Sequence, residues 1–138
     1  MSAAPVLQVA VPGPVARLFD YLPPARGDVP GPGCRVTVPF GRARRVGVVV
    51  AHAREATVDA RRLRAVDAVL DAEPVLPGDL LALGRWAAGY YHHPPGEVLA
   101  TMLPAALRRG ESPDVEPPPR WRVTAAGRDA LAAGLAGA

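Results

Sequence analysis

The residues that could do chemistry fall into three short segments. Residues 19–21 read Phe-Asp-Tyr, an acid between two aromatic rings. Residues 41–45 place a glycine before three arginines, and residues 61–64 carry three more. Guanidinium groups can grip a phosphate in two places, aromatic rings stack on bases, and an ionised carboxylate accepts hydrogen bonds from hydroxyl or amino groups. These residue types together indicate a surface that binds an anionic partner.

Enzymatic chemistry has little support in the sequence. There is no Gly-x-x-x-x-Gly-Lys-Ser/Thr loop for nucleotide phosphates, and no lysine at all. A set of nucleophile, histidine and acid cannot be assembled, because Asp20 and His92 would meet only by chance. Cys34, His92 and His93 lack the four well-placed ligands that structural zinc needs. We therefore expect no catalytic residue, metal or cofactor in this chain.

The composition indicates one small domain with a core of Val, Leu and Ala. Of the 138 residues 49% are hydrophobic but only 5% aromatic, and the 17 prolines and 14 glycines favour short strands and turns. Lys, Ile and Asn, which have AT-rich codons, are all absent, so the exclusive use of arginine reflects a GC-rich genome. The net charge of +3 still favours an anionic partner.

The N-terminus and the cysteine content indicate the compartment. Cys34 is the single cysteine, which excludes a disulfide within the chain and fits a reducing cytosol. Residues 1–4 lack a basic segment and no long apolar run follows. We therefore expect neither a signal peptide nor a transmembrane helix, and we expect a cytoplasmic monomer.

Apolar residues alternate with polar ones in the first half of the chain, which is typical of strands. Strands are predicted over residues 6–11, 18–22, 35–40, 45–52 and 63–70. The third and fourth would form a hairpin around a turn at residues 41–43. In the last strand, Leu63, Ala65 and Val69 would face inward.

The period changes to that of helices after Pro77. Asp79 is a plausible cap or first-turn acid. The expected apolar face of the first helix carries Leu80, Leu83, Ala87 and Tyr90. We expect the aromatic cluster Trp86, Tyr90 and Tyr91, which has helical spacing, to lie in the core. Further helices are expected over residues 96–102, 105–109 and 125–133, the last capped by Thr124.

These elements predict an α+β fold, in which a small, bent, barrel-like antiparallel sheet is followed by short helices. Residues 1–110 would form this domain. Residues 111–120 contain three acids and four prolines and are interpreted as a linker. Residues 121–138 contain a single helix, which cannot bury its own apolar face, and are interpreted as the truncated start of another domain.

Four segments, in order, resemble the N-terminal domain of the primosomal protein N′ (PriA) family. They are RLFDYL at residues 17–22, GCRVTVPFG at 33–41, LRAV with LDAEP at 63–74, and WAAGYYHHP at 86–94. Together they cover about residues 6–110. A shorter match, WRVT at residues 121–124, resembles the entry to the family's winged-helix domain.

The resemblance implies a 3′ DNA-binding domain that captures the 3′-terminal nucleotide of the nascent leading strand at stalled replication forks, whichever base it carries. In the family, an ATP-driven 3′→5′ helicase core, with ATP, Mg²⁺ and zinc sites, lies downstream of this domain. It acts with primosome proteins in the bacterial cytoplasm. The family's pocket residues fall on Phe19, Asp20, Tyr21, Gly41 and Arg64. The family pattern has lysine at the last of these positions, so the charge is kept.

Asp20 is an unusual residue for a DNA-binding surface, because a carboxylate repels phosphate. It suits the end of a strand, where a free hydroxyl replaces the next phosphate and can donate to the carboxylate. A 3′-phosphate would instead bring like charges together. We therefore expect Asp20 to distinguish a 3′-hydroxyl end from a blocked end. On a strand, Phe19 and Tyr21 point away from Asp20, so at least one of them is expected in the core, and stacking on the base is left open for the other.

The remaining candidates are the turn glycine and the arginines. Gly41 can adopt a positive φ and also lets a nucleotide approach the backbone. Arg64 would contact phosphate near the strand terminus, as would Arg62 in the same cluster. Further phosphate contacts are expected from the hairpin tip, at Arg42, Arg44 and Arg45.

Two other functions remain open. A β-rich domain with a basic hairpin could dock an acidic partner, such as single-stranded DNA-binding protein. The tail could bind duplex DNA if its winged-helix resemblance holds, although it is too short to do so alone. Binding that requires a free 3′-hydroxyl would distinguish the DNA-end function from both.

Overall fold

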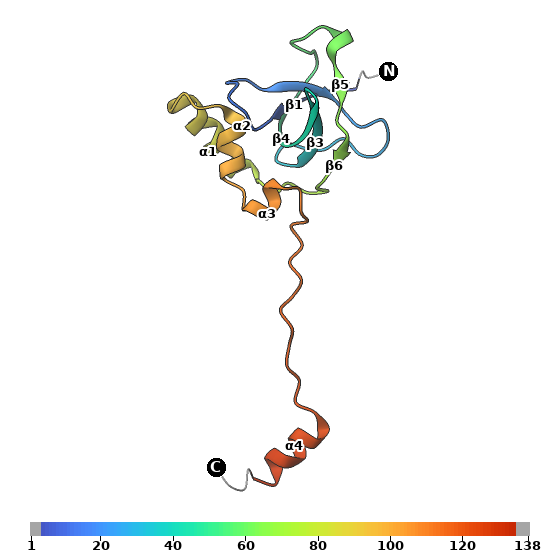
Figure 1. Ribbon diagram of the computed structural model, residues 1–138, viewed down its shortest axis with the longest axis vertical. Coiled ribbons are helices and arrows are strands. Elements are labelled where there is room, and N and C mark those ends of the chain that lie inside the picture. Colours follow the sequence, from blue (N-terminus) through green and yellow to red (C-terminus); the bar gives the residue numbers. More distant parts are fainter. Residues whose placement is uncertain (1–3, 135–138) are drawn as a thin grey trace.

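The computed structural model describes residues 4–134. The terminal residues 1–3 of the expected domain and 135–138 of the expected winged-helix segment lie outside the described residues. Strands occupy the first half of the chain and helices the second, which confirms the α+β class (Figure 1). The strands are β1 Val6–Ala10, β2 Phe19–Leu22, β3 Arg35–Phe40, β4 Ala43–Ala53, β5 Arg64–Ala65 and β6 Ala68–Val69. The helices are the 3-10 turn η1 Ala60–Arg62, α1 Gly78–Tyr90, α2 Pro95–Thr101, α3 Ala105–Arg108 and α4 Ala125–Ala132.

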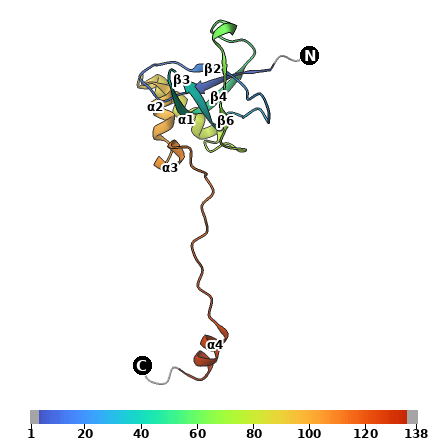
Figure 2. The same cartoon turned by 45° about the vertical axis from the view of Figure 1, so that its right-hand side comes forward.

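The strands form one sheet in the order β5-β2-β1-β4-β3-β6. The edge strands β5 and β6 are separated in the chain only by Val66 and Asp67, so one short segment lies against both edges. The Val66 N–H donates to the Leu22 carbonyl at 3.0 Å, and the Asp67 N–H donates to the Thr37 carbonyl at 2.8 Å. The sheet therefore curls into a half-barrel whose two edges are joined by residues 64–69 (Figure 2).

The segment after η1 differs from its sequence prediction in two ways. Its first strand, β5, runs parallel to β2, whereas all other pairs in the sheet are antiparallel as expected. Ala65 is exposed and Val66 is buried, so the prediction that Ala65 faces inward is wrong. Leu63 and Val69 are half-buried. The alternation of a single strand fails here because the segment turns from one sheet edge to the other at Val66.

β4 is covered on both faces, which explains its continuous apolar run. Val49 lies inside the barrel, in one cluster with Leu7 and Val36. Val48 and Val50 face the other way and pack with residues of the helices, including Leu81 and Leu99. Successive residues of a strand point to opposite faces, so β4 contributes to two cores at once.

The helices α1 and α2 pack against each other and against the outer face of the sheet (Figure 1). Two glycines allow the close approach. A β-carbon at Gly84 of α1 would overlap the Leu99 side chain of α2, and one at Gly96 would overlap the Val11 carbonyl oxygen just after β1. These helices fix the segment that leads from β1 into β2.

The prediction that Trp86, Tyr90 and Tyr91 pack in the core is wrong. Their exposed fractions are 58%, 64% and 70%. The expected apolar face is also turned outward, with Leu80 and Leu83 exposed and Ala87 half-buried. The buried face consists of Leu81, Gly84 and Ala88. Small side chains let this face approach α2 closely, and bulkier residues are accommodated on the outside.

A buried ion pair joins the barrel to the helical layer. Arg35, which strand alternation places on the polar face of β3, is fully buried and pairs with Asp71 at 2.7 Å. The Asp71 carboxylate also accepts from the Arg35 Nε–H and backbone N–H, at 2.9 and 2.8 Å. The remaining guanidinium nitrogen donates to the carbonyls of Leu107 and Glu111. Since all three guanidinium nitrogens donate and the Asp71 carboxylate opposes the charge, the buried charge is compensated inside the protein.

The C-terminal segment is extended and then helical. Residues 111–124 are exposed and contain no helix or strand, and they lead away from the barrel to α4 (Figure 1). Thr124 caps α4, because its Oγ1 accepts from the Gly127 N–H at 3.1 Å. α4 buries none of its residues.

Candidate nucleic-acid interface

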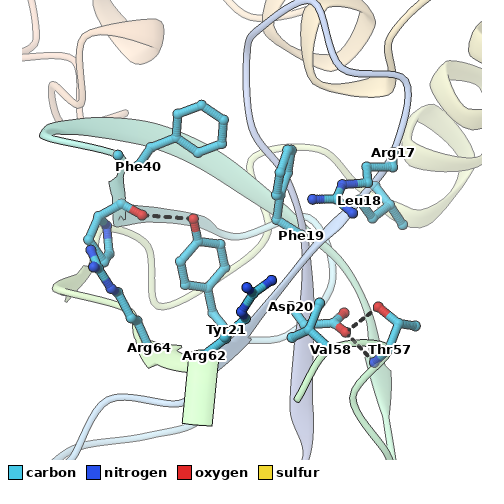
Figure 3. A pocket seen from close by; sticks show the side chains of 12 residues that line it. Arg17, Leu18, Phe19, Asp20, Tyr21, Phe40, Thr57, Val58, Arg62 and Arg64 are labelled. Atoms are coloured by element: carbon cyan, nitrogen blue, oxygen red, sulfur yellow. Dashed lines mark hydrogen bonds between the residues drawn. The ribbon is translucent and has the colours of Figure 1, made fainter. Parts of the chain in front are cut away.

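A cleft of about 310 Å³ opens at one end of the barrel, where β2 begins and the β3–β4 hairpin turns (Figure 3). We call it the β2 cleft. Its walls come from the β2 segment, the hairpin, the loop after β4 and the η1–β5 segment. The lining residues are Arg17, Leu18, Phe19, Asp20, Tyr21, Pro39, Phe40, Gly41, Thr57, Val58, Arg62 and Arg64.

The five residues singled out by the sequence resemblance all line this one cleft: Phe19, Asp20, Tyr21, Gly41 and Arg64. They come from three separate segments of the chain. Tyr21 and Arg64 are direct partners in the parallel β2–β5 pair, so the curling of the sheet is what joins the last segment to the first. Their role in DNA binding stays a prediction.

The aromatic residues of the cleft have different environments. Tyr21 is buried, and its hydroxyl donates to the Pro39 carbonyl at 2.8 Å, which ties β2 to β3. Burial raises the pKa of the Tyr21 phenol, although the positive charge of Arg64 opposes this shift. Phe19 is half-buried and meets the Phe40 ring edge-on, with the ring centroids 5.0 Å apart. Tyr21 thus packs in the core, as expected of at least one of the two rings, whereas Phe19 and Phe40 expose apolar surface in the cleft.

Asp20 reaches the cleft without an ion-pair partner among residues 4–134. Its Oδ2 accepts from the Thr57 backbone N–H at 2.6 Å and from the Thr57 hydroxyl at 2.7 Å (Figure 3). No protein donor to its Oδ1 is found within the described chain. The loop after β4 therefore holds the carboxylate in place while one oxygen remains available to a ligand in the cleft.

The backbone of β2 is only partly covered at its outer edge beside Asp20. The Leu22 carbonyl points to that edge, because it accepts from Val66 N–H. Backbone groups alternate in direction along a strand of an antiparallel pair, so the N–H and C=O of Asp20 point to the same edge. The parallel pairing of Tyr21 with Arg64 uses the Asp20 carbonyl as acceptor for the Arg64 N–H, so within the described residues only the Asp20 N–H has no strand partner at this edge. An edge of this kind can form hydrogen bonds with an extended ligand.

Gly41 lies at the hairpin turn with φ +61°, a conformation that side chains rarely adopt. The space that a β-carbon would occupy there contains no atom within 4 Å. Glycine therefore allows the backbone conformation of the turn. Because it has no side chain, it also leaves this side of the cleft open to a ligand.

The charge in the cleft is mostly positive. Arg17, Arg62 and Arg64 line it and are exposed, and Asp20 is the one acid among the lining residues. Arg17 also lies over the Phe19 ring, 5.1 Å from its centroid. Sequence reasoning missed Arg17 and Thr57. Arg17 lies two residues before the Phe-Asp-Tyr segment and begins the recognised RLFDYL match, which was an available signal, whereas nothing in the sequence marks Thr57.

The three arginines of the hairpin do not line the cleft. Arg42 is exposed at the turn. Arg44 pairs with Asp67 at 3.2 Å. Arg45 donates to the Pro12 carbonyl and lies 4.7 Å from the centroid of the Phe40 ring. Phosphate contacts from these residues stay a prediction for a strand that extends beyond the cleft.

Other chemistry has no structural counterpart in the described residues. Between residues 4 and 134, no group of three or more His, Cys, Asp or Glu is placed to hold a metal ion. Cys34 is buried, and burial raises the pKa of its thiol. None of the helices described is both long and apolar enough to span a membrane.

Comparison with known proteins identifies the family. A family model described as the 3′ DNA-binding domain (3′BD) of PriA matches residues 8–104, which include the entire β2 cleft. The chain belongs to the PriA 3′ DNA-binding domain family. This confirms the resemblance in the sequence and identifies DNA as the partner of the domain.

Relatives of this PriA domain support the assignment. Replication restart protein PriA of Haemophilus influenzae is 38% identical over 94% of this chain and 18% of its own length. The proteins of the same name from Bacillus subtilis and Buchnera aphidicola are 33% and 29% identical over 68% and 74% of this chain. The chain spans less than a fifth of the length of these relatives.

Proposed function

We propose that the β2 cleft binds the 3′-terminal nucleotide of a single DNA strand, whichever base it carries. The observation that supports this most is the position of Asp20. It is a carboxylate without an ion pair among residues 4–134, held by Thr57, in a cleft whose other charged residues are arginines. An acid in a phosphate-binding cleft is favourable where the strand ends in a hydroxyl, which can donate to the carboxylate in place of the next phosphate.

Each wall of the cleft has a part in this proposal. Asp20 Oδ1 accepts a hydrogen bond from the 3′-hydroxyl and repels a 3′-phosphate. Arg64 neutralises the phosphate that links the terminal nucleotide to its neighbour, and Arg17 and Arg62 contact the phosphates that precede it. Phe19 and Phe40 contact the base or sugar with apolar surface. The Asp20 backbone N–H at the edge of β2 can donate to an acceptor, and every base carries an acceptor on its edge, which fits binding without base selection.

The wider role is that of the family. We propose that the domain marks the 3′ end of the nascent leading strand at stalled replication forks for a parent protein that is an ATP-dependent 3′→5′ helicase. The ATP, Mg²⁺ and zinc sites of that parent would lie outside this chain, and its setting would be the bacterial cytoplasm. We further propose residues 1–110 as the DNA-binding domain, 111–120 as a linker and 121–138 as the start of a winged-helix domain.

A second candidate function rests on the exposed face of α1. Leu80, Leu83, Trp86 and Tyr90 are all exposed, and the Trp86 and Tyr90 rings stack with their centroids 5.0 Å apart. Arg85 adds a positive charge beside them. Aromatic and arginine side chains are common at the centre of protein interfaces. An acidic partner such as single-stranded DNA-binding protein, or another primosome protein, could bind this face.

Fluorescence anisotropy with matched oligonucleotides tests the primary proposal. The oligonucleotides carry a 5′ dye, share one sequence and end in a 3′-hydroxyl or a 3′-phosphate. The hydroxyl end should bind more tightly, changing the terminal base should have little effect, and Asp20→Ala should abolish the preference. Equal affinity of the wild-type domain for both ends would overturn the assignment of the cleft.

A further inference from the structure

A second groove lies next to the β2 cleft and shares two of its lining residues. It has a volume of about 400 Å³ and runs between the segment before β2 and the C-terminal end of α1. Arg17 and Leu18 line both the groove and the β2 cleft. A strand whose end lies in the cleft could therefore continue past Arg17 into this groove, which we call the α1 groove.

The side chains of the α1 groove suit a nucleic acid strand. Arg17, Arg85, His92 and His93 line it, and its lining contains no Asp or Glu. Between these polar groups the wall is apolar, formed in part by Leu18 and Ala88. Guanidinium and imidazole N–H groups can donate to phosphate oxygens, and apolar wall can cover a sugar or the face of a base. Because the lining is basic and contains no acid, the groove favours an anionic strand as its ligand.

His92 has an unusual backbone conformation at the end of α1, beside the groove. It is the one residue other than glycine with positive φ, at +51°, among residues 4–134. It ends α1 in a Schellman motif, in which the His93 N–H donates to the Ala88 carbonyl and the His92 N–H to the Gly89 carbonyl. Glycine is the residue that favours this position. The chain therefore accepts backbone strain at a site that carries an imidazole into the groove.

We propose that the α1 groove binds the nucleotides that precede the terminal one on the same DNA strand. This inference rests on the proposed function of the β2 cleft and extends it. Arg17 contacts the strand where it leaves the cleft. Arg85 and His92 then contact phosphates further along, while Leu18 and Ala88 cover the sugar or base between them. The domain thus recognises a short single-stranded segment with its end, rather than one nucleotide alone.

The test compares 3′-hydroxyl oligonucleotides of two, four and six nucleotides by anisotropy at low salt. Affinity of the wild-type domain should rise with length. In Arg85→Ala the gain from two to six nucleotides should become at least about threefold smaller, because one phosphate contact, which contributes about −0.7 to the slope of log K against log salt concentration, is lost. Arg26→Ala removes the same charge from an exposed loop that lines neither site, and should leave the gain unchanged.

His92→Gly separates binding from folding. Glycine relieves the strained backbone, so the thermal midpoint should rise, while the length-dependent gain in affinity should fall as in Arg85→Ala. If the domain prefers a 3′-hydroxyl over a 3′-phosphate but Arg85→Ala and Arg26→Ala show the same gain with length, the groove proposal is overturned and the cleft proposal stands. If the preference for the hydroxyl is absent from the wild type, the cleft proposal itself fails.

Discussion

Replacing Arg64 with alanine should weaken DNA binding and make it less sensitive to salt. Arg64 is one of three arginines that line the β2 cleft, and it is exposed to an incoming phosphate. Each phosphate that a protein neutralises on a single strand contributes about −0.7 to the slope of log K against log salt concentration. If Arg64 contacts one phosphate, the slope becomes less negative by about 0.7 in Arg64→Ala. Between 50 and 200 mM salt, the loss of affinity then becomes about 2.6-fold smaller than in the wild type.

The assay is an anisotropy titration of a 3′-hydroxyl hexanucleotide at four salt concentrations between about 50 and 200 mM. Arg26→Ala is the matched control, because it lowers the net charge equally but lies outside the cleft. The control should keep the wild-type slope. If the two variants change the slope by the same amount, Arg64 acts only through the overall charge of the domain, and its contact with phosphate is refuted.

Three further predictions concern the support of the site and the core. Thr57→Val keeps the backbone hydrogen bond to Asp20 but removes the hydroxyl donor. Anisotropy should show that the preference for hydroxyl over phosphate ends is reduced by about 2- to 10-fold. An unchanged preference would mean that the Thr57 hydroxyl does not position the carboxylate. Asp71→Ala leaves Arg35 buried without its counter-ion. Urea titrations should show the free energy of unfolding lowered by about 3–5 kcal/mol, and a loss below about 1 kcal/mol would contradict the buried pair. Cys34 is buried, and burial raises the pKa of its thiol. At pH 8 the thiol should therefore react with a thiol reagent much more slowly in the folded domain than in denaturant. Equal rates would show that the barrel opens readily.

Much of the fold was predictable from local patterns. The β3–β4 hairpin follows from alternating valines around Gly41, and the start of α4 follows from the capping residue Thr124. Both signals act between residues that are close in the chain. The gathering of Phe19 and Arg64 in one cleft was predictable only through family resemblance, because it depends on the closure of the barrel.

What the sequence could not predict depends on long-range packing. The orientation of α1 was predicted wrongly because large apolar residues outweigh small ones in a periodicity argument, whereas close packing here favours the side with Gly84 and Ala88. The burial of Arg35 was missed because its partner, Asp71, lies 36 residues away. The hydrogen bonds from Thr57 to Asp20 were missed because that loop has no recognisable pattern.

The most direct test of the central claim is a double-mutant cycle between the protein and the end of the DNA. Wild type and Asp20→Ala are each titrated with an oligonucleotide that ends in a 3′-hydroxyl or in a 3′-hydrogen. Hydrogen bonds to charged groups contribute about 1.5–3 kcal/mol, so removing the hydroxyl should weaken wild-type binding by about 10- to 100-fold. The same change should have almost no effect on Asp20→Ala. If wild type and variant lose the same affinity when the hydroxyl is removed, Asp20 does not recognise the end of the strand.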